Sequence, residues 1–343
     1  MGGSNAPRRE GAAVMAGGPA ILGEGLRKSF GETVALDGLD LRAERGTVLA
    51  VLGPNGAGKT TAVRIFTTLL PPDGGRAEVD GLDVTTHPGE VRARVGLTGQ
   101  YAAVDEYLTG PENLEMVGRL SRLSKRDAGR RARELMERFE LTEAGNRLVK
   151  TYSGGMRRKL DLAASLVAFP EVVFLDEPTT GLDPRARFGM WDMIRDLVGQ
   201  GTTILLTTQY LEEADLLADR IAVIDHGKVI ASGTSDELKS QAGGTRLEVR
   251  VGHEGSMEDA LRVVNDVCDE EPYVDETRRT ISVSGDGMTT LTAMVRSFDG
   301  AGVRVDDIHL RRPTLDDVFL KLTGHIAEED REAQVEMAEG EAR

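Results

Sequence analysis

Residues 53–61 read Gly-Pro-Asn-Gly-Ala-Gly-Lys-Thr-Thr, and their spacing is that of a phosphate-binding loop. The pattern G-x-x-x-x-G-K-[ST] runs from Gly53 to Thr60. The glycines let successive backbone N–H groups turn towards a triphosphate, and the next helix adds the positive end of its dipole. Lys59 would reach the β- and γ-phosphates, and the Thr60 hydroxyl would bind Mg²⁺. The loop therefore predicts a site for a nucleoside triphosphate with Mg²⁺.

A second group of candidate residues follows an apolar run, Val172–Leu175, which ends in Asp176 and Glu177. A buried strand that delivers Asp176 at its C-terminal edge can hold Mg²⁺ opposite Thr60. Glu177 is one residue further on and points the other way, so its carboxylate can polarise an attacking water. We predict Asp176 as a metal ligand and Glu177 as a catalytic residue.

The segment Ser153-Gly154-Gly155 opens a basic, amphipathic helix. Ser153 is placed to cap this helix, and the two glycines leave its first N–H groups open to an anion. A simple helix start is the alternative interpretation. The pattern puts Arg157, Arg158 and Lys159 on one side, and turns the leucines and alanines that follow towards a core.

The elements that must position these residues alternate along the chain from Ala20 to about Gln241. Helical stretches, including 60–70, separate short apolar runs rich in β-branched residues, which predicts a largely parallel α/β sheet. These runs are Thr47–Leu52, Val172–Leu175, Thr203–Thr207 and Ile221–Ile224. A small antiparallel layer is predicted from Leu22–Phe30, Gly38–Arg42 and Arg76–Val79. A charged helical insert is expected at about 100–155. Its basic residues favour a solvated face, with proximity to an anionic membrane leaflet as the alternative.

The C-terminal part of the chain repeats neither this pattern nor its motifs. After Gly243-Gly244, strands and helices are predicted in a βαββαβ order, which is typical of a ferredoxin-like α+β domain at 245–324. Thr314 and Asp317 have the spacing of a capping box for a last helix. Residues 1–19 and the acidic residues 327–343 are predicted to be disordered tails.

The composition excludes several classes of protein. A chain of 343 residues with 40% apolar and 29% charged residues fits a globular protein of two domains. The formal charge of −15 argues against a general nucleic-acid binder. One cysteine, Cys268, permits neither an intramolecular disulfide nor a multi-cysteine metal site. We expect neither a signal peptide nor a membrane-spanning run, so any membrane role must come through a partner.

The order of the motifs resembles that of the ATP-binding cassette ATPases. The phosphate loop is followed by Gln100, Ser153-Gly154-Gly155, Asp176-Glu177-Pro178 and Gly181-Leu182-Asp183-Pro184, over roughly residues 20–240. The resemblance implies a P-loop NTPase cassette: a RecA-like parallel sheet, an antiparallel β layer and a helical insert. It also implies a dimer in which ATP lies between the phosphate loop of one subunit and Ser153-Gly154-Gly155 of the other.

The resemblance assigns further roles to individual residues. Phe30 would stack on adenine, with a core phenylalanine as the alternative, Gln100 would sense Mg²⁺, and Asp183 would communicate across the dimer. The sequence contains no Asn-Lys-x-Asp motif for reading guanine, which disfavours a GTPase, although stacking on Phe30 tolerates either purine. The predicted nucleotide-binding set is Phe30, Gly53, Pro54, Asn55, Gly56, Ala57, Gly58, Lys59, Thr60, Thr61, Gln100, Ser153, Gly154, Gly155 and Asp183. The predicted metal ligands are Thr60, Gln100 and Asp176, and the predicted catalytic residues are Glu177, Lys59 and Gln209.

The sequence departs from the family pattern at two positions. Met156 replaces a common glutamine at the end of the Ser-Gly-Gly segment, where we expect little effect. Gln209 replaces the histidine that the family usually places against the γ-phosphate. Glutamine can donate a hydrogen bond to phosphate but carries no proton or positive charge. We therefore predict that hydrolysis survives through Glu177, is modest without the membrane partner and lacks a histidine-like limb near pH ~6.5.

Two stretches resemble the daunorubicin/doxorubicin-resistance branch of this family. They are Thr208–Asp215 around Gln209 and the C-terminal Arg311–Leu320. The implied function is a peripheral ATPase at the cytoplasmic face of the membrane, which drives export of a drug or lipophilic product through a separate permease. Two alternatives remain open: an importer ATPase with a regulatory C-terminal domain, and a soluble family member without a transport role that acts on ribosomes or DNA.

Overall fold

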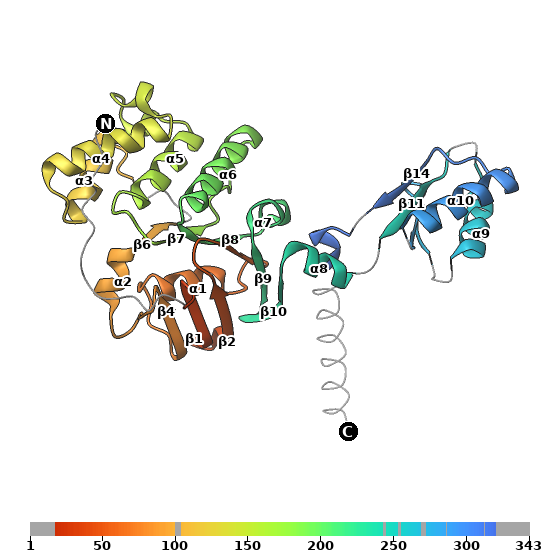
Figure 1. Ribbon diagram of the computed structural model, residues 1–343, viewed down its shortest axis with the longest axis horizontal. Coiled ribbons are helices and arrows are strands. Elements are labelled where there is room, and N and C mark those ends of the chain that lie inside the picture. Colours follow the sequence, from red (N-terminus) through yellow and green to blue (C-terminus); the bar gives the residue numbers. More distant parts are fainter. Residues whose placement is uncertain are drawn as a thin grey trace, which may run out of the picture. The chain divides into compact units, whose positions relative to one another are not determined.

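The structure is a computed structural model that describes residues 18–99, 104–242, 245–252, 255–268, 272–285, 287–311 and 313–319. The chain forms two compact units, which divide between Ser232 and Gly233 (Figure 1). This division lies before the boundary at 241–245 that the sequence suggests, since helix α8 (Ser235–Ala242) belongs to the second unit.

The central sheet of the first unit has the strand order β10-β9-β3-β8-β7-β6. Its strands are β3 (Val48–Leu52), β6 (Val95–Thr98), β7 (Val172–Asp176), β8 (Thr203–Thr208), β9 (Arg220–Asp225) and β10 (Lys228–Gly233). Strand β3 runs parallel to both β8 and β9, and β7 runs parallel to both β6 and β8. Every residue of β3, β7 and β8 is buried, as expected where both faces of a parallel sheet are covered. The predicted parallel sheet is confirmed.

A second sheet in this unit is antiparallel and has the order β2-β1-β4-β5. Its strands are β1 (Ile21–Phe30), β2 (Thr33–Ala43), β4 (Gly74–Val79) and β5 (Leu82–Asp83). This confirms the predicted antiparallel layer, although β2 begins earlier than the predicted strand because it pairs with β1 from Thr33 onwards.

Seven named helices accompany the two sheets in the described part of the first unit. They are α1 (Lys59–Phe66), α2 (Pro88–Arg94), α3 (Gly110–Leu120), α4 (Lys125–Arg138), α5 (Gly154–Ser165), α6 (Pro184–Gly199) and α7 (Leu211–Leu217). Helix α1 is shorter than the predicted 60–70, because Thr68 takes a left-handed φ of 62°. The N–H groups of Leu69 and Leu70 turn back to the Arg64 carbonyl and close the helix end.

Alternate residues of the central strands face two different cores. Val173 and Leu175 pack with α3–α6, whereas Val172 and Phe174 pack with α1 and the antiparallel sheet. The Phe174 ring stacks on Phe66 of α1 with 6.2 Å between ring centroids. Figure 1 shows the same layering, with α3–α6 on one side of the central sheet and α1, β1, β2 and β4 on the other. Because side chains of a strand alternate, residue 176 belongs to the face that meets α1.

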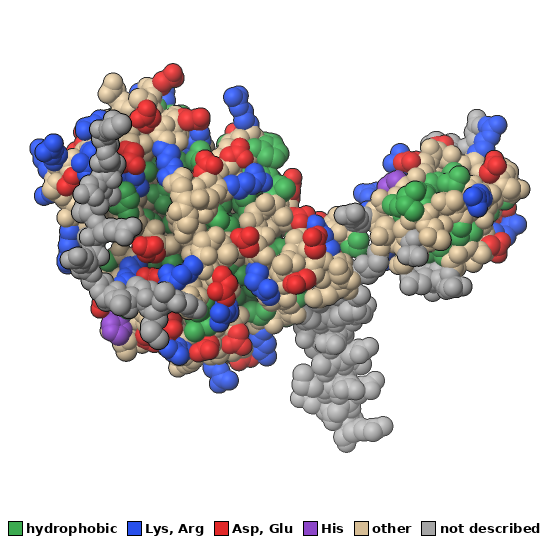
Figure 2. Space-filling view, in the orientation of Figure 1, with side chains coloured by type: hydrophobic (Ala, Val, Ile, Leu, Met, Phe, Trp, Pro, Cys, Tyr) green, Lys and Arg blue, Asp and Glu red, His purple; other side chains and the backbone are tan. Residues whose placement is uncertain are grey.

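Two of the basic residues of the helical insert pair with acidic residues of the same helix. Arg130 pairs with Asp127 at 2.8 Å, and Arg131 pairs with Glu134 at 2.6 Å. Figure 2 shows acidic and basic side chains interspersed on the visible face of the first unit. Arg131 differs from a solvated residue, because it is buried, donates to the Leu166 carbonyl and lies 3.9 Å from the Phe169 ring centroid. No helix among the described residues is long and apolar enough to cross a bilayer.

The second unit contains an antiparallel sheet with the order β12-β13-β11-β14. After α8, its elements are β11 (Arg246–Arg250), α9 (Met257–Val267), β12 (Tyr273–Asp275), β13 (Thr280–Ser284), α10 (Gly287–Ala301) and β14 (Asp307–Arg311). Their βαββαβ order is the one that the sequence suggests. Thr314 and Asp317 exchange backbone-to-side-chain hydrogen bonds of 2.8 and 3.4 Å, which form a capping box before helical residues 315–319.

Candidate functional site

The predicted phosphate loop lies between the end of β3 and the start of α1. Gly56 and Gly58 have φ values of 86° and 105°, which side chains rarely tolerate. A Cβ at Gly53 would lie 2.2 Å from the Ile224 carbonyl oxygen, and one at Gly58 would lie 2.5 Å from the Ala35 carbonyl oxygen. Glycine is therefore required at both positions by the neighbouring backbone of β9 and β2.

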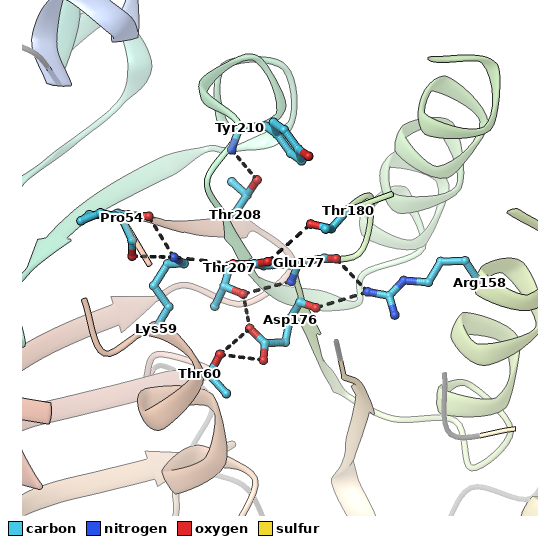
Figure 3. A network of polar contacts seen from close by, with 11 residues as sticks. Pro54, Lys59, Thr60, Arg158, Asp176, Glu177, Thr180, Thr207, Thr208 and Tyr210 are labelled. Carbon is cyan, nitrogen blue, oxygen red and sulfur yellow. Dashed lines mark hydrogen bonds and ion pairs between the residues drawn. The ribbon is translucent and has the colours of Figure 1, made fainter. Parts of the chain in front are cut away.

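The Lys59 amine lies beneath this loop and contacts the loop carbonyls (Figure 3). Its Nζ donates to the Gly53 and Pro54 oxygens at 2.8 and 2.9 Å and lies 3.6 Å from Glu177 Oε1. The side chain is only 5% exposed. Burial lowers the pKa of Lys59, and the Glu177 and Asp176 carboxylates act against that shift. The amine is thus a partly desolvated cation at the place where a phosphate would enter the loop.

Asp176 meets α1 as the strand alternation requires. Thr60 Oγ1 lies 3.2 and 3.0 Å from the two Asp176 carboxylate oxygens, and Thr207 Oγ1 donates to Asp176 Oδ1 at 2.5 Å. Strands β7 and β3 both run parallel to β8, so their carboxyl ends lie at one edge of the sheet. This placement brings the hydroxyl of Thr60 and the carboxylate of Asp176 together, as predicted for the metal site.

Glu177 occupies the first position after β7 in an uncommon backbone conformation. Its φ is 50°, in the left-handed region. Its N–H donates to both the carbonyl oxygen and Oγ1 of Thr207 at 3.1 Å. The carboxylate is buried, with Oε1 near Lys59 and Oε2 accepting from Thr180 Oγ1 at 3.4 Å. The backbone turn therefore aims Glu177 at the lysine and the phosphate loop.

Arg158 is a residue of this site that the sequence reasoning misplaced. We expected it on the polar side of the helix, but its side chain is 7% exposed, whereas Arg157 pairs with Glu106 at the surface. Successive residues of a helix are rotated by about 100°, so three consecutive basic residues cannot share one face. The guanidinium of Arg158 donates to the carbonyl oxygens of Glu177 and Asp176 at 2.8 and 3.2 Å (Figure 3). It also donates to the Pro178 carbonyl oxygen at 2.7 Å.

Glu213 of α7 is a second residue that the sequence reasoning missed. It is fully buried, and its Oε1 accepts from Thr179 Oγ1 at 2.8 Å and from Trp191 Nε1 at 2.9 Å. Burial raises the pKa of Glu213, against hydrogen bonds from Thr208, Trp191 and Thr179 that lower it. The Glu-Glu-Ala sequence at 212–214 gives no local sign of burial, because Glu212 beside it is exposed.

The motifs that contain Ser153 and Asp183 each begin a helix. Ser153 caps α5 and accepts from Met156 N at 3.3 Å, and Asp183 caps α6 and accepts from Ala186 N at 2.9 Å. Both caps are exposed. Among the described residues, no hydrogen bond or ion pair joins either cap to the phosphate loop. In the part of the chain that the structure describes, the side-chain hydrogen bonds of both caps thus serve their own helices.

The other predicted residues differ in how they are placed. Phe30 ends β1 with its ring 49% exposed and Lys28 Nζ 5.8 Å from the ring centroid, so it is not a core residue. Gln209 is exposed directly after β8. Gln100 lies outside the described residues. Within the loop and α1, Pro54, Asn55 and Gly56 are exposed, Ala57 is buried, and Thr61 is half-buried.

The donor set around Asp176 is suited to a hard divalent cation. It offers a hydroxyl and a carboxylate, both oxygen ligands of the kind that Mg²⁺ prefers. Within the described residues, no group of three or more His, Cys, Asp and Glu is gathered as a protein-only metal site. A cation bound here would take its remaining ligands from phosphate and water, as in other phosphoryl-transfer sites.

Comparisons with known proteins agree with this geometry. The family profile described as ABC transporter matches residues 36–180. Daunorubicin resistance ATP-binding protein DrrA2 of Streptomyces coeruleorubidus is 59% identical over 91% of this chain and 97% of its own. Daunorubicin/doxorubicin resistance ATP-binding protein DrrA of Streptomyces peucetius is 52% identical over 90% of this chain and 94% of its own. A solved ATP-binding subunit of an ABC transporter has 26% identity and a TM-score of 0.59 over 65% of this chain and 92% of its own.

Proposed function

The chain belongs to the ATP-binding cassette family of transporter ATPases, in the branch of the daunorubicin/doxorubicin resistance proteins, and we propose that it powers export of a drug or a similar lipophilic product. The chain binds ATP and is an ATPase. One observation carries the proposal. The phosphate loop with Lys59 and the carboxylates of Asp176 and Glu177 converge at one edge of a parallel sheet.

We assign the residues of this edge to the following roles. The loop N–H groups and Lys59 bind the phosphates, and Thr60 and Asp176 hold Mg²⁺, which neutralises charge on the phosphate oxygens when bound. Glu177 orients the attacking water and accepts its proton. Phe30 stacks on the base. Gln209, exposed at the end of the neighbouring strand β8, donates to a phosphate oxygen.

The exposed cap Ser153-Gly154-Gly155 supports a dimer as the working form. Its Oγ and first N–H groups form an anion-binding helix start, and among the described residues the one hydrogen bond of the Ser153 side chain comes from Met156 N of α5 itself. We propose that this cap binds the γ-phosphate held by a second copy, so that two nucleotides lie between two chains. ATP would then close the dimer, and hydrolysis would release it.

A separate membrane permease is the proposed partner of the dimer. The relatives named as resistance proteins are described as ATP-binding proteins, and the alignment covers 97% and 94% of their length. The described residues contain no helix able to cross a bilayer. We therefore place the chain at the cytoplasmic face of the membrane, held there by the permease, and place cargo selection in that partner.

The test uses the purified full chain and a cell that carries the chain together with a candidate permease. We expect Lys59→Ala to abolish Mg-ATP turnover, and Glu177→Gln to lower kcat by about 10²–10⁴-fold. The exposed Lys125→Ala on α4 is the matched control and should leave turnover unchanged. Cells that carry the Glu177→Gln variant should accumulate daunorubicin, whereas cells that carry the unmodified chain should export it. Full turnover by Lys59→Ala, or equal accumulation in both strains, would refute the proposal.

A further inference from the structure

One buried guanidinium ties the helix that begins at Ser153-Gly154-Gly155 to the loop that carries the catalytic carboxylate. We propose that Arg158 is a positioning residue, through which occupation of the cap on α5 sets the backbone position of Glu177 in the same chain. This inference rests on the proposed function, because it needs a nucleotide at the cap and hydrolysis at Glu177.

The contacts of Arg158 reach two segments that are distant in sequence. Its Nη2 donates to the carbonyl oxygens of Glu177 at 2.8 Å and Asp176 at 3.2 Å, and its Nε donates to Pro178 O at 2.7 Å. Its Nη1 donates at 2.6 Å to Gly99 O, directly after β6. One side chain thus holds three consecutive carbonyl groups, from the last residue of β7 to the second residue after it, and one directly after β6.

These carbonyl groups stand where the sheet ends, and among the described residues, besides a 3.3 Å bond from Thr180 N to Glu177 O, the hydrogen bonds that hold them come from Arg158. Glu177 turns into the left-handed region with a φ of 50°, so the chain leaves the strand ladder at this point. Buried carbonyl groups without strand partners need other donors. The planar guanidinium has five N–H donors in a fixed fork, whereas a lysine amine at this position would act as a compact point charge. The fork of Arg158 serves both segments at once.

The charge of Arg158 is compensated inside the protein. Asp161, one turn further along α5 and also buried, has Oδ2 3.8 Å from Nη1. Burial lowers the pKa of Arg158, while the carboxylates of Asp161, Asp176, Glu213 and Glu177 act to raise it. The guanidinium stays charged because arginine is not deprotonated in proteins. Its hydrogen bonds to the carbonyl groups are therefore charge-assisted, and such bonds are about twice as strong as neutral ones.

The position of Arg158 on α5 explains how this contact could act across the dimer. It lies five residues after Ser153, which is about 7 Å along a helix axis. A helix of this length moves as a rigid body, so a shift of its first turn onto a phosphate also shifts the guanidinium. The loop after β7 would follow, and Glu177 with it. A displacement of about 1 Å at a catalytic group is enough to change kcat by about 100-fold.

The experiment compares Arg158→Lys and Arg158→Gln with Arg157→Gln in the purified full chain. Arg157 neighbours Arg158 but pairs with Glu106 at the surface, so its variant should behave as the unmodified chain. We expect both Arg158 variants to bind ADP, the probe for the phosphate loop alone, with unchanged affinity. Their kcat should fall by about 10–100-fold, and amide exchange of residues 177–182 should increase. Arg158→Lys should recover little activity.

The outcomes separate this inference from the proposed function and from simple structural support. If the unmodified chain turns over ATP and the Arg158 variants keep its kcat, the inference is wrong while the function stands. If kcat per folded molecule is unchanged and only the melting temperature falls, Arg158 merely stabilises the fold and the inference also fails. If the unmodified chain and Lys59→Ala have equal turnover, the proposed function is wrong and the coupling has no basis.

Discussion

Replacement of Glu213 by glutamine should change how the stability of the first unit depends on pH. The buried carboxyl has a raised pKa, so the folded chain binds its proton more tightly than the unfolded chain, whose reference value is 4.5. This contribution to the free energy of unfolding is fully present below that reference value. It is lost as the pH rises through the folded pKa.

The size of the stability change is set by the one proton that Glu213 binds. Between the two pKa values, Glu213 lowers the free energy of unfolding by up to about 1.4 kcal/mol per pH unit. Glutamine has nearly the same shape and keeps an oxygen acceptor for Thr179 and Trp191, but it does not titrate. The Glu213→Gln variant should therefore gain stability relative to the unmodified chain as the pH rises from about 5, until the difference levels off above the folded pKa.

The assay can use the one tryptophan of the chain. Trp191 is buried and donates to Glu213 Oε1 at 2.9 Å, so its fluorescence reports on the first unit and on this contact. Urea unfolding of the nucleotide-free chain would be followed at a series of pH values. Glu212→Gln on the exposed side of α7 is the matched control and should run parallel to the unmodified chain. A pH-independent difference between Glu213→Gln and the unmodified chain would refute the reasoning.

Three further perturbations test the loop, the base and the γ-phosphate. Gly58→Ala would place its Cβ 2.5 Å from the Ala35 carbonyl oxygen at a φ of 105°. This variant should lower the free energy of unfolding by about 1–3 kcal/mol and abolish ATP binding, as measured by thermal unfolding and nucleotide titration. The control Gly189→Ala, whose Cβ would lie in open space on α6, should change neither quantity. Phe30→Ala should weaken ATP and GTP binding alike by about 10–100-fold, because stacking on a base contributes about 1–3 kcal/mol, and unchanged affinity would exclude stacking. Gln209→His should introduce a limb near pH ~6.5 into the pH–rate profile, and an undiminished rate in Gln209→Ala would exclude a role for Gln209.

The parts of the site that depend on local sequence were predictable. Residue type and spacing predict the phosphate loop at Gly53–Thr60. They also predict the two apolar strands that end before Gly53 and at Asp176. Strand alternation after Val172 also places Asp176 on the face of α1. The end of α1 was missed because a left-handed Thr68, rather than glycine or proline, stops the helix.

The residues that support the site could not be predicted in the same way. Arg158 and Glu213 act through partners distant in the sequence, such as Gly99 and Thr179, so their neighbours along the chain carry no signal. The rotation of about 100° per helical residue could have predicted that one of the three consecutive basic residues of α5 is buried. It could not have predicted which carbonyl groups accept hydrogen bonds from that residue. The partners of Ser153 and Asp183 would belong to another chain, and one copy of the protein cannot supply them.

The close approach of Gly53 to Ile224 and of Gly58 to Ala35 has a consequence for how nucleotide enters. The backbone of β9 and of β2 packs against the phosphate loop and fixes its conformation, so the loop has its binding shape before a ligand arrives. The loop therefore loses little conformational entropy when it binds, and this entropy loss subtracts little from the favourable interaction between loop and phosphate. Loop amides should accordingly show low mobility in the empty protein, with only small changes when ADP is added.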